Sequence, residues 1–192
     1  GELIGLTYQR EQEVTAWHRH IFGGISGIPT ITISDYANIL NGTRIIITKS
    51  DGKEITFTST TGVASAQQFK NETNSDTTAT NLKNAINTAN SASLTGVTAT
   101  VTGAIITLTE VTPTGLGYLT LTSLDQSRVK GISQTKAECE SVAVIPTDND
   151  EYQTWVIVKR TINNITRRYV EFLNTFKFTA TDNTTFNFLD SA

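Results

Sequence analysis

The stretch Gln153–Leu173, QTWVIVKRTINNITRRYVEFL, decides the fold class of this chain. Its two halves, Thr154–Ile162 and Ile165–Leu173, are dense in β-branched and aromatic residues, which favours strands. Asn163 and Asn164 separate the halves, and asparagine tolerates the positive φ angles that a type I′ turn requires. The stretch therefore predicts an antiparallel hairpin.

The first strand of this hairpin carries apolar residues on both faces. Trp155 and Ile157 share one face, and Val156 and Val158 share the other. A strand with one solvated face would alternate more cleanly between apolar and polar residues. We therefore expect the hairpin to be covered on both sides, as in stacked sheets or propeller blades.

Composition limits the classes of function. The chain has 192 residues with 15 basic and 18 acidic side chains, a net charge of −3, which argues against a sequence-specific or general nucleic-acid binder. No apolar run approaches the roughly 20 residues that span a bilayer. The single cysteine gives no zinc motif and no intrachain disulfide. The absence of Met, even at position 1, indicates a piece of a longer chain or a processed product.

Residues 25–136 differ from the rest, because they lack Trp and carry few charges. They predict a hairpin turning at Ser50–Lys53 and another turning at Thr102-Gly103. Between these lies one helix over Thr77–Asn90, with Ser75, Asp76 and Thr77 as possible N-caps. Its apolar stripe has helical spacing and consists of Ala79, Leu82, Ala85, Ile86 and Ala89.

The predicted fold class is mainly β, an antiparallel sheet that is propeller-blade-like or stacked, with a small inserted α+β module containing one helix. The expected boundaries are 1–24 and 137–175 for a discontinuous β unit, 25–136 for the insert, and 176–192 for the truncated start of a following β segment. Insertion into a hairpin loop is well tolerated. Without the insert, Glu13–His20 and Cys139–Ile145 would be adjacent antiparallel strands.

Two histidines are weak candidates for a metal site. His18 and His20 lie two residues apart and so share a face of a strand, and Glu138 or Glu140 could add a carboxylate. A structural role for both imidazoles is the alternative. Cys139 could act as a nucleophile with His20 as base, but a lone strand cysteine is typically a small buried hydrophobe.

A cluster of cations lies at the turn end of the hairpin and consists of Lys159, Arg160, Arg167 and Arg168. Such a cluster could grip phosphate, but the negative net charge favours a solvated hairpin tip or a contact with another subunit. Glu11, Glu13 and Glu171 are possible intrachain partners. We expect Trp17 and Trp155 to be core residues, although both could serve an interface.

Four segments carry a resemblance to a known family: LIGLTYQREQEVTAWHRH at 3–20, ESVAVIP at 140–146, TWVIVKRTI at 154–162 and RRYVEFL at 167–173. In this order they resemble a segment of bacteriophage tail structural proteins, the nozzle or tail-tubular proteins of short-tailed phages. The insert departs from that pattern. Gly42–Thr58, Ala79–Asn87 and Thr98–Thr109 within it resemble a small phage virion-protein module.

The resemblance implies a non-enzymatic virion protein, part of a tail nozzle or tail-tube platform with a propeller-like β architecture. It implies copies of itself in a ring and adjacent tail proteins as partners, assembly in the bacterial cytoplasm, and no cofactor. One alternative is a glycan- or receptor-binding adhesin module carried by the insert, with Tyr36, Phe57, Phe69 and Tyr118 as its aromatics. Another is a metal-dependent hydrolase that uses His18 and His20.

Overall fold

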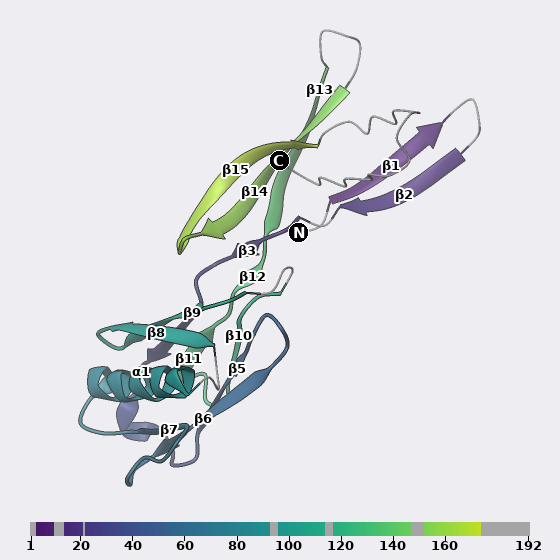
Figure 1. Cartoon of the computed structure of the whole chain (residues 1–192). Helices are drawn as coiled ribbons and strands as arrows, with labels where there is room; N and C mark the ends of the chain where they lie inside the picture. Colours follow the sequence, from purple (N-terminus) through teal and green to yellow (C-terminus); the bar gives the residue numbers. More distant parts are fainter. Residues whose placement is uncertain are drawn as a thin grey trace. The chain divides into compact units, whose positions relative to one another are not determined.

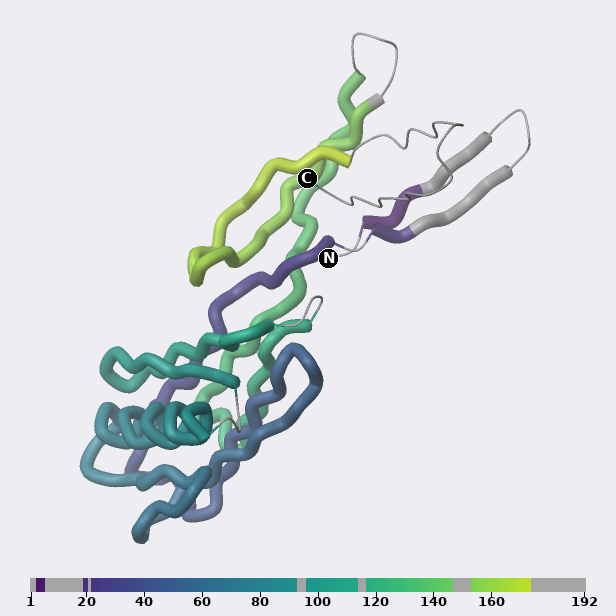
Figure 2. The backbone as a smooth tube through the Cα atoms, in the orientation of Figure 1, coloured from purple at the N-terminus to yellow at the C-terminus, as the bar shows by residue number. Residues whose placement is uncertain are grey.

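A computed structural model describes residues 3–9, 14–20, 22–92, 96–113, 117–146 and 152–173; for 6–9, 14–18 and 152 it describes the backbone. The chain divides into two compact units, residues 1–26 with 136–192, and residues 27–135 (Figure 1). Figure 2 follows the chain out of the first unit and back into it. We call residues 27–135 the insert module; its bounds lie one or two residues from the expected 25–136.

Two four-stranded sheets make up most of the insert module. The first has the order β10 (Thr120–Ser123), β5 (Arg44–Thr48), β6 (Glu54–Thr60), β7 (Gln68–Lys70). The second has the order β11 (Val129–Ile132), β4 (Thr30–Ile33), β9 (Ile105–Glu110), β8 (Val97–Thr102). Only the β6–β7 pairing in these two sheets is parallel. A short 3-10 helix, η1 (Tyr36–Asn38), follows β4.

One apolar core joins both sheets to the helix. Buried and less buried residues alternate along β5 and β6, as expected for strands with one inward face. Ile45, Phe57 and Ile106 come from different strands, and each is completely buried. Burial of such a side chain contributes about 1.5–3 kcal/mol. The module is therefore a stacked-sheet structure around a single core.

The helix α1 (Ser75–Ser91) is longer at both ends than the expected 77–90. Its N-cap is Asn74, whose side chain accepts a hydrogen bond from the Thr77 amide at 2.8 Å. The expected caps Ser75, Asp76 and Thr77 are wrong, because all three already lie in the first turn. The apolar stripe is confirmed: four of its residues are buried and Ala85 packs against the core.

Asparagine side chains of α1 satisfy the outer edges of both sheets. Asn81 Nδ2 donates to the Lys70 carbonyl of β7 at 2.9 Å. Asn87 makes a pair of bonds with Ala99 of β8: its Nδ2 donates to the Ala99 carbonyl at 2.9 Å, and its Oδ1 accepts from the Ala99 amide at 2.8 Å. Unpaired strand edges invite association with other chains. The helix therefore covers one edge strand of each sheet, and its asparagine side chains bond backbone groups of both edge strands.

Replacing Thr73 with glycine is expected to raise the free energy of unfolding of the insert module by about 0.5–1 kcal/mol. Thr73 has a φ of 65°, which is unfavourable for a β-branched residue, and it lies inside a tight turn in which the Asn74 amide donates to the Glu72 carbonyl at 2.7 Å. Urea denaturation followed by circular dichroism measures the change. Thr61→Gly is the control. Thr61 is exposed and does not have a positive φ angle, so glycine relieves no strain there and the substitution lowers stability. An equal loss at Thr73 would contradict the argument.

The predicted hairpin is confirmed in residues and turn type. It consists of β14 (Tyr152–Ile162) and β15 (Ile165–Leu173), which pair from Ile162↔Ile165 outward. Asn163 and Asn164 have φ angles of 51° and 60°, as a type I′ turn requires. β13 (Glu138–Pro146) pairs with the other side of β14, with a bulge between Cys139 and Ser141.

The expected pairing of 13–20 with 139–145 is wrong. β2 (Val14–His20) pairs instead with β1 (Leu3–Gln9), and β13 pairs with β14. Both observed pairings join strands that are neighbours in the sequence, and closing a short loop costs less chain entropy than closing a long one. The segments that lead into and out of the insert, β3 (Ile25–Ser26) and β12 (Thr135–Lys136), pair with each other.

The described residues are mainly β with one α-helix, as predicted. Within this part of the chain they form no closed barrel or propeller. In the insert module, two sheets face each other across a core and α1 packs beside their edge strands, which makes a stacked arrangement.

Candidate functional site

The four cations at the turn end of the hairpin lie opposite each other on β14 and β15. Lys159 faces Arg168, and Arg160 faces Arg167. Three of them reach a carboxylate of the same sheet, as separate ion pairs: Arg160–Glu171 at 2.8 Å, Arg168–Glu140 at 2.6 Å and Lys159–Glu138 at 3.9 Å. Glu171 is one of the partners expected from the sequence, whereas Glu138 and Glu140 come from β13, which lies on the far side of β14.

These ion pairs differ in exposure. The Arg160 and Glu171 side chains are 16% and 12% exposed, whereas the Arg168 side chain is 69% exposed. Exposed pairs contribute about 0–1 kcal/mol each, so their main effect is to favour one strand register. Arg167 is exposed and makes no ion pair with another described residue. It is the member of the cluster that an external carboxylate would meet most easily.

One face of the β13–β15 sheet is buried at its centre, and the opposite face is more open. Val156 and Val158 form the centre of the buried face and pack with Phe22 and Ala137. The opposite face carries Trp155, whose ring lies 5.5 Å from that of Phe172. The expectation that both sides are covered, with Trp155 in the core, is wrong for the described residues, because Trp155 is half-buried.

Large apolar side chains of this sheet remain exposed. Val170 is 67% exposed and Phe172 is 37% exposed, both on the open face of β15. Ile145 is exposed on this same face, whereas Val142, Val144, Ile162 and Ile165 are exposed on the face of Val156, away from its buried centre. Contiguous exposed apolar surface is typical of interaction sites. This surface and the cations beside it are the candidate functional site.

The two histidines lie on β2. His18 pairs with Gly5 and His20 with Leu3, two positions apart, so the backbone directs both to one face. The His18 side chain lies outside the described residues. Among the residues that the structure does describe, no three His, Cys, Asp or Glu side chains gather into a possible metal site. The weak metal prediction therefore stays a prediction.

Cys139 is half-buried beside the small core of the sheet, as expected for a strand cysteine. Its Sγ lies 3.5 Å from the Ser141 carbonyl, across the bulge in β13. This position is consistent with a packing role. The alternative role of Cys139 as a nucleophile, with His20 as base, stays a prediction.

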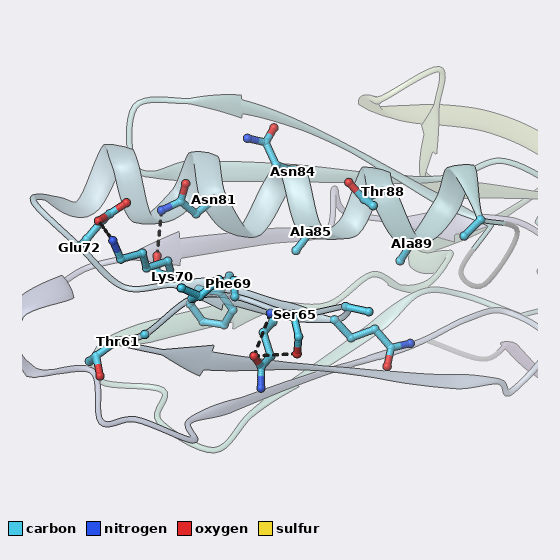
Figure 3. A pocket seen from close by; sticks show the side chains of 17 residues that line it. Thr61, Ser65, Phe69, Lys70, Glu72, Asn81, Asn84, Ala85, Thr88 and Ala89 are labelled. Carbon is cyan, nitrogen blue, oxygen red and sulfur yellow. Dashed lines mark hydrogen bonds and ion pairs between the residues drawn. The ribbon is translucent and has the colours of Figure 1, made fainter.

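The insert module contains an open groove of about 940 Å³ between α1 and the loop 61–67 (Figure 3). Ala85, Ala89 and Ala92 form an apolar wall on the helix. At one end, Lys70 and Glu72 form an ion pair, which lowers the pKa of the Glu72 carboxyl. The aromatic residue among those that line the groove, Phe69, is only 1% exposed. Its ring is therefore unavailable for stacking on a sugar.

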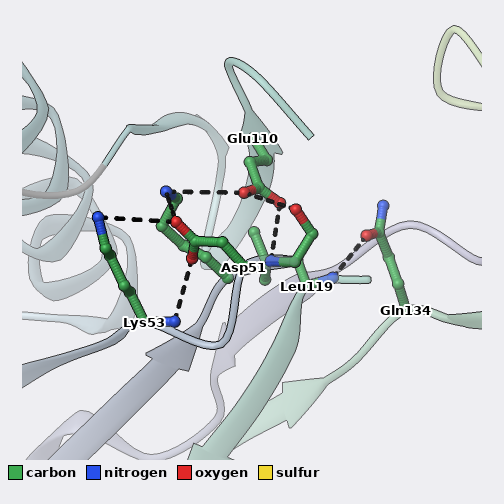
Figure 4. Close-up of polar contacts among 7 residues, drawn as sticks. Asp51, Lys53, Glu110, Leu119 and Gln134 are labelled. Carbon is green, nitrogen blue, oxygen red and sulfur yellow. Dashed lines mark hydrogen bonds and ion pairs between the residues drawn. The ribbon is translucent and has the colours of Figure 1, made fainter. Parts of the chain in front are cut away.

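A polar network that no motif in the sequence predicts joins the two sheets of the insert module (Figure 4). The Glu110 carboxylate, at the end of β9, accepts hydrogen bonds from the Ser50 amide at 3.1 Å and the Ser50 hydroxyl at 2.9 Å. The Glu110 side chain is 5% exposed, and Lys49 Nζ lies 3.8 Å away. Ser50 belongs to the β5–β6 turn, so the contact spans 60 residues of sequence.

Asp51, next along the same turn, accepts from the Lys53 amide and from Lys49 Nζ, both at 3.0 Å. These two bonds hold the pKa of the Asp51 carboxyl below its usual value. Lys49 thus lies between two carboxylates, Asp51 and Glu110. The network fixes the predicted Asp-Gly turn against the second sheet. It is a structural feature, and no reacting group with a base beside it is found within it.

Comparison with protein-family models, curated protein sequences and solved structures gave no match for this chain. Among the described residues, no helix is both long enough and apolar enough to cross a membrane.

Proposed function

We propose that this chain is a non-enzymatic structural protein of a phage virion, a piece of a tail nozzle or tail-tube platform that assembles through contacts between subunits. The proposal rests on the position in the fold of the segments that resemble phage tail proteins. The described residues within 3–20 and 140–173 lie in β1, β2, β13, β14 and β15, all within one of the two compact units. The departing segment, 27–135, folds as the other unit.

The surface of the β13–β15 sheet supports a role in assembly. Its open face carries exposed Val170 and Phe172, and its other face carries Arg167, an exposed cation that makes no ion pair with another described residue. Subunit interfaces are typically enriched in aromatic residues and arginine. The proposed partners are therefore other copies of the chain, in a ring, and adjacent tail proteins. The proposed location is the virion, after assembly in the host cytoplasm.

The alternative function is a glycan- or receptor-binding module in the insert. The groove beside α1 offers space for a ligand, but its apolar wall consists of small alanine side chains. Sugar sites typically use an exposed aromatic ring, but Phe57 and Phe69 are both buried, and Tyr36 and Tyr118 are half-buried and do not line the groove. The groove therefore gives this alternative less support than the β13–β15 surface gives assembly.

Light scattering over a wide range of concentrations tests the proposal. We expect a discrete oligomer at micromolar concentration. Mass spectrometry of purified particles of the encoding phage is expected to find peptides of this chain in the tail. A chain that stays monomeric at every concentration and is missing from the particles would overturn the proposal, and glycan-array binding would then test the alternative.

A further inference from the structure

The outer edge of β15 presents backbone groups that no other described strand uses. β15 is the last strand in the order β13-β14-β15. In a hairpin with a two-residue turn, the closing pair Ile162↔Ile165 exchanges hydrogen bonds, and the bonded pairs then alternate. The amides and carbonyls of four residues therefore point outward, namely Thr166, Arg168, Val170 and Phe172.

Little in the sequence of β15 protects this edge. Short strands, charged side chains (lysines above all), prolines and bulges commonly blunt an exposed edge. β15 carries Arg167, Arg168 and Glu171, but it is nine residues long, contains no Lys or Pro, and pairs with β14 without a register shift. Val170 and Ile165, at 67% and 52% exposure, are accessible on it. The edge is thus a template for another strand.

Charge complementarity favours a second copy of β15 as the strand that pairs with this edge. In a two-fold symmetric antiparallel pair of identical strands, one central residue lies opposite its own copy. The other residues pair symmetrically on either side of this centre. Centres at Arg167 or Arg168 would place two arginines opposite each other, which is destabilising. A centre at Tyr169 pairs all nine residues, from Ile165 opposite Leu173, and sets Arg167 opposite Glu171 of the partner subunit. Other centres shorten the overlap.

The Tyr169 centre also fits the backbone. It opposes Arg168 to Val170 and Thr166 to Phe172, so outward amides and carbonyls meet their counterparts and about eight hydrogen bonds form. Arg167 and Glu171 then belong to a non-bonded pair, in which side chains approach more closely. Arg167 gains the carboxylate that it lacks among the described residues.

We propose that two copies of this chain pair through β15, antiparallel and centred on Tyr169, to form one continuous six-stranded sheet. The inference rests on the proposed function, since it names one of the subunit contacts. A two-fold contact joins copies in pairs, so a ring requires a second, different contact.

Cysteine crosslinking tests the register in the full chain, with Cys139→Ala removing the native thiol. Opposed residues at a non-bonded position have Cα atoms about 4.5 Å apart, which a disulfide can bridge. Tyr169→Cys is therefore expected to give a covalent dimer on mild oxidation. Ile165→Cys is the matched control, because it is exposed on the same strand but lies opposite Leu173, so it stays unlinked.

Charge reversal adds a measurement without thiols. Arg167→Glu is expected to weaken dimerisation about tenfold in sedimentation equilibrium, since two opposed pairs per dimer become repulsive. Arg44→Glu, an exposed site in the insert module, is the control and leaves the affinity unchanged.

The outcomes separate the two proposals. A discrete oligomer in which the Tyr169→Cys variant forms no crosslink overturns the β15 contact and leaves the proposed assembly role standing. A chain that is monomeric throughout overturns both. Crosslinking that appears only after truncation at Leu173 would show that the chain's own following residues occupy the edge, and would overturn the inference for the full chain.

Discussion

Asn87→Asp is expected to lower the free energy of unfolding of the insert module by about 3 kcal/mol. Asn87 satisfies both backbone groups of Ala99, which is 5% exposed on the edge strand β8. The aspartate keeps the acceptor for the Ala99 amide but replaces the donor with a charged oxygen. The Ala99 carbonyl then loses its partner and faces a negative charge. Urea denaturation followed by circular dichroism measures the loss.

Asn84→Asp is the matched control for this substitution. Asn84 lies one turn earlier on the same helix but is exposed, so both variants add the same charge to the helix dipole. The control is expected to change stability by less than about 0.5 kcal/mol. Below about pH 3, the introduced carboxyl of Asn87→Asp is protonated and can donate to the Ala99 carbonyl again, so the difference between the variants should shrink. Equal losses in both variants would show that the Ala99 contact is dispensable.

Local rules in the sequence were sufficient for turns and for the helix. Asn163-Asn164 and Asp51-Gly52 adopt the tight turns expected of them, because the positive φ angles of such turns depend on the residues themselves. The apolar stripe from Ala79 to Ala89 identified the helix, since its spacing depends on one element alone. These features need no knowledge of distant residues.

Features that depend on distant partners were missed. β7 and β11 are only three and four residues long, so their strand conformation comes from pairing with β6 and β4 rather than from their own pattern. β7 is also parallel to β6, a pairing that no turn signal announces. The pairing of β2 was predicted wrongly, because several strands of this chain have patterns that fit one another.

The candidate site shows the same division. The cluster of Lys159, Arg160, Arg167 and Arg168 followed from the hairpin register, which the turn fixes. Its pairing with Glu138 and Glu140 required the position of β13, which the sequence alone did not give. The exposure of Phe172 and Val170 is likewise a property of packing.

Glu110→Ala is expected to lower the stability of the insert module by about 3 kcal/mol. The substitution removes the acceptor of both the Ser50 amide and the Ser50 hydroxyl, and it takes a carboxylate away from Lys49. Hydrogen bonds to charged groups contribute about 1.5–3 kcal/mol each, and removal of one partner leaves the others poorly solvated in a part-buried site. Since the contact joins β9 of one sheet to the β5–β6 turn of the other, its loss also loosens their packing.

Two spectroscopic signals measured on the same samples give this prediction a sharp test. Trp17 and Trp155 both lie outside the insert module, so their fluorescence reports on the other unit. In Glu110→Ala, the circular dichroism transition of the insert module is expected to move to lower urea, while the fluorescence transition stays in place. Glu54→Ala is the control, because Glu54 is exposed and makes one long bond of 3.4 Å with Thr48. If Glu54→Ala lowered the free energy of unfolding as much as Glu110→Ala, the contact of Glu110 with Ser50 would not contribute specifically to stability. Hydrophobic packing alone would then account for the association of the two sheets.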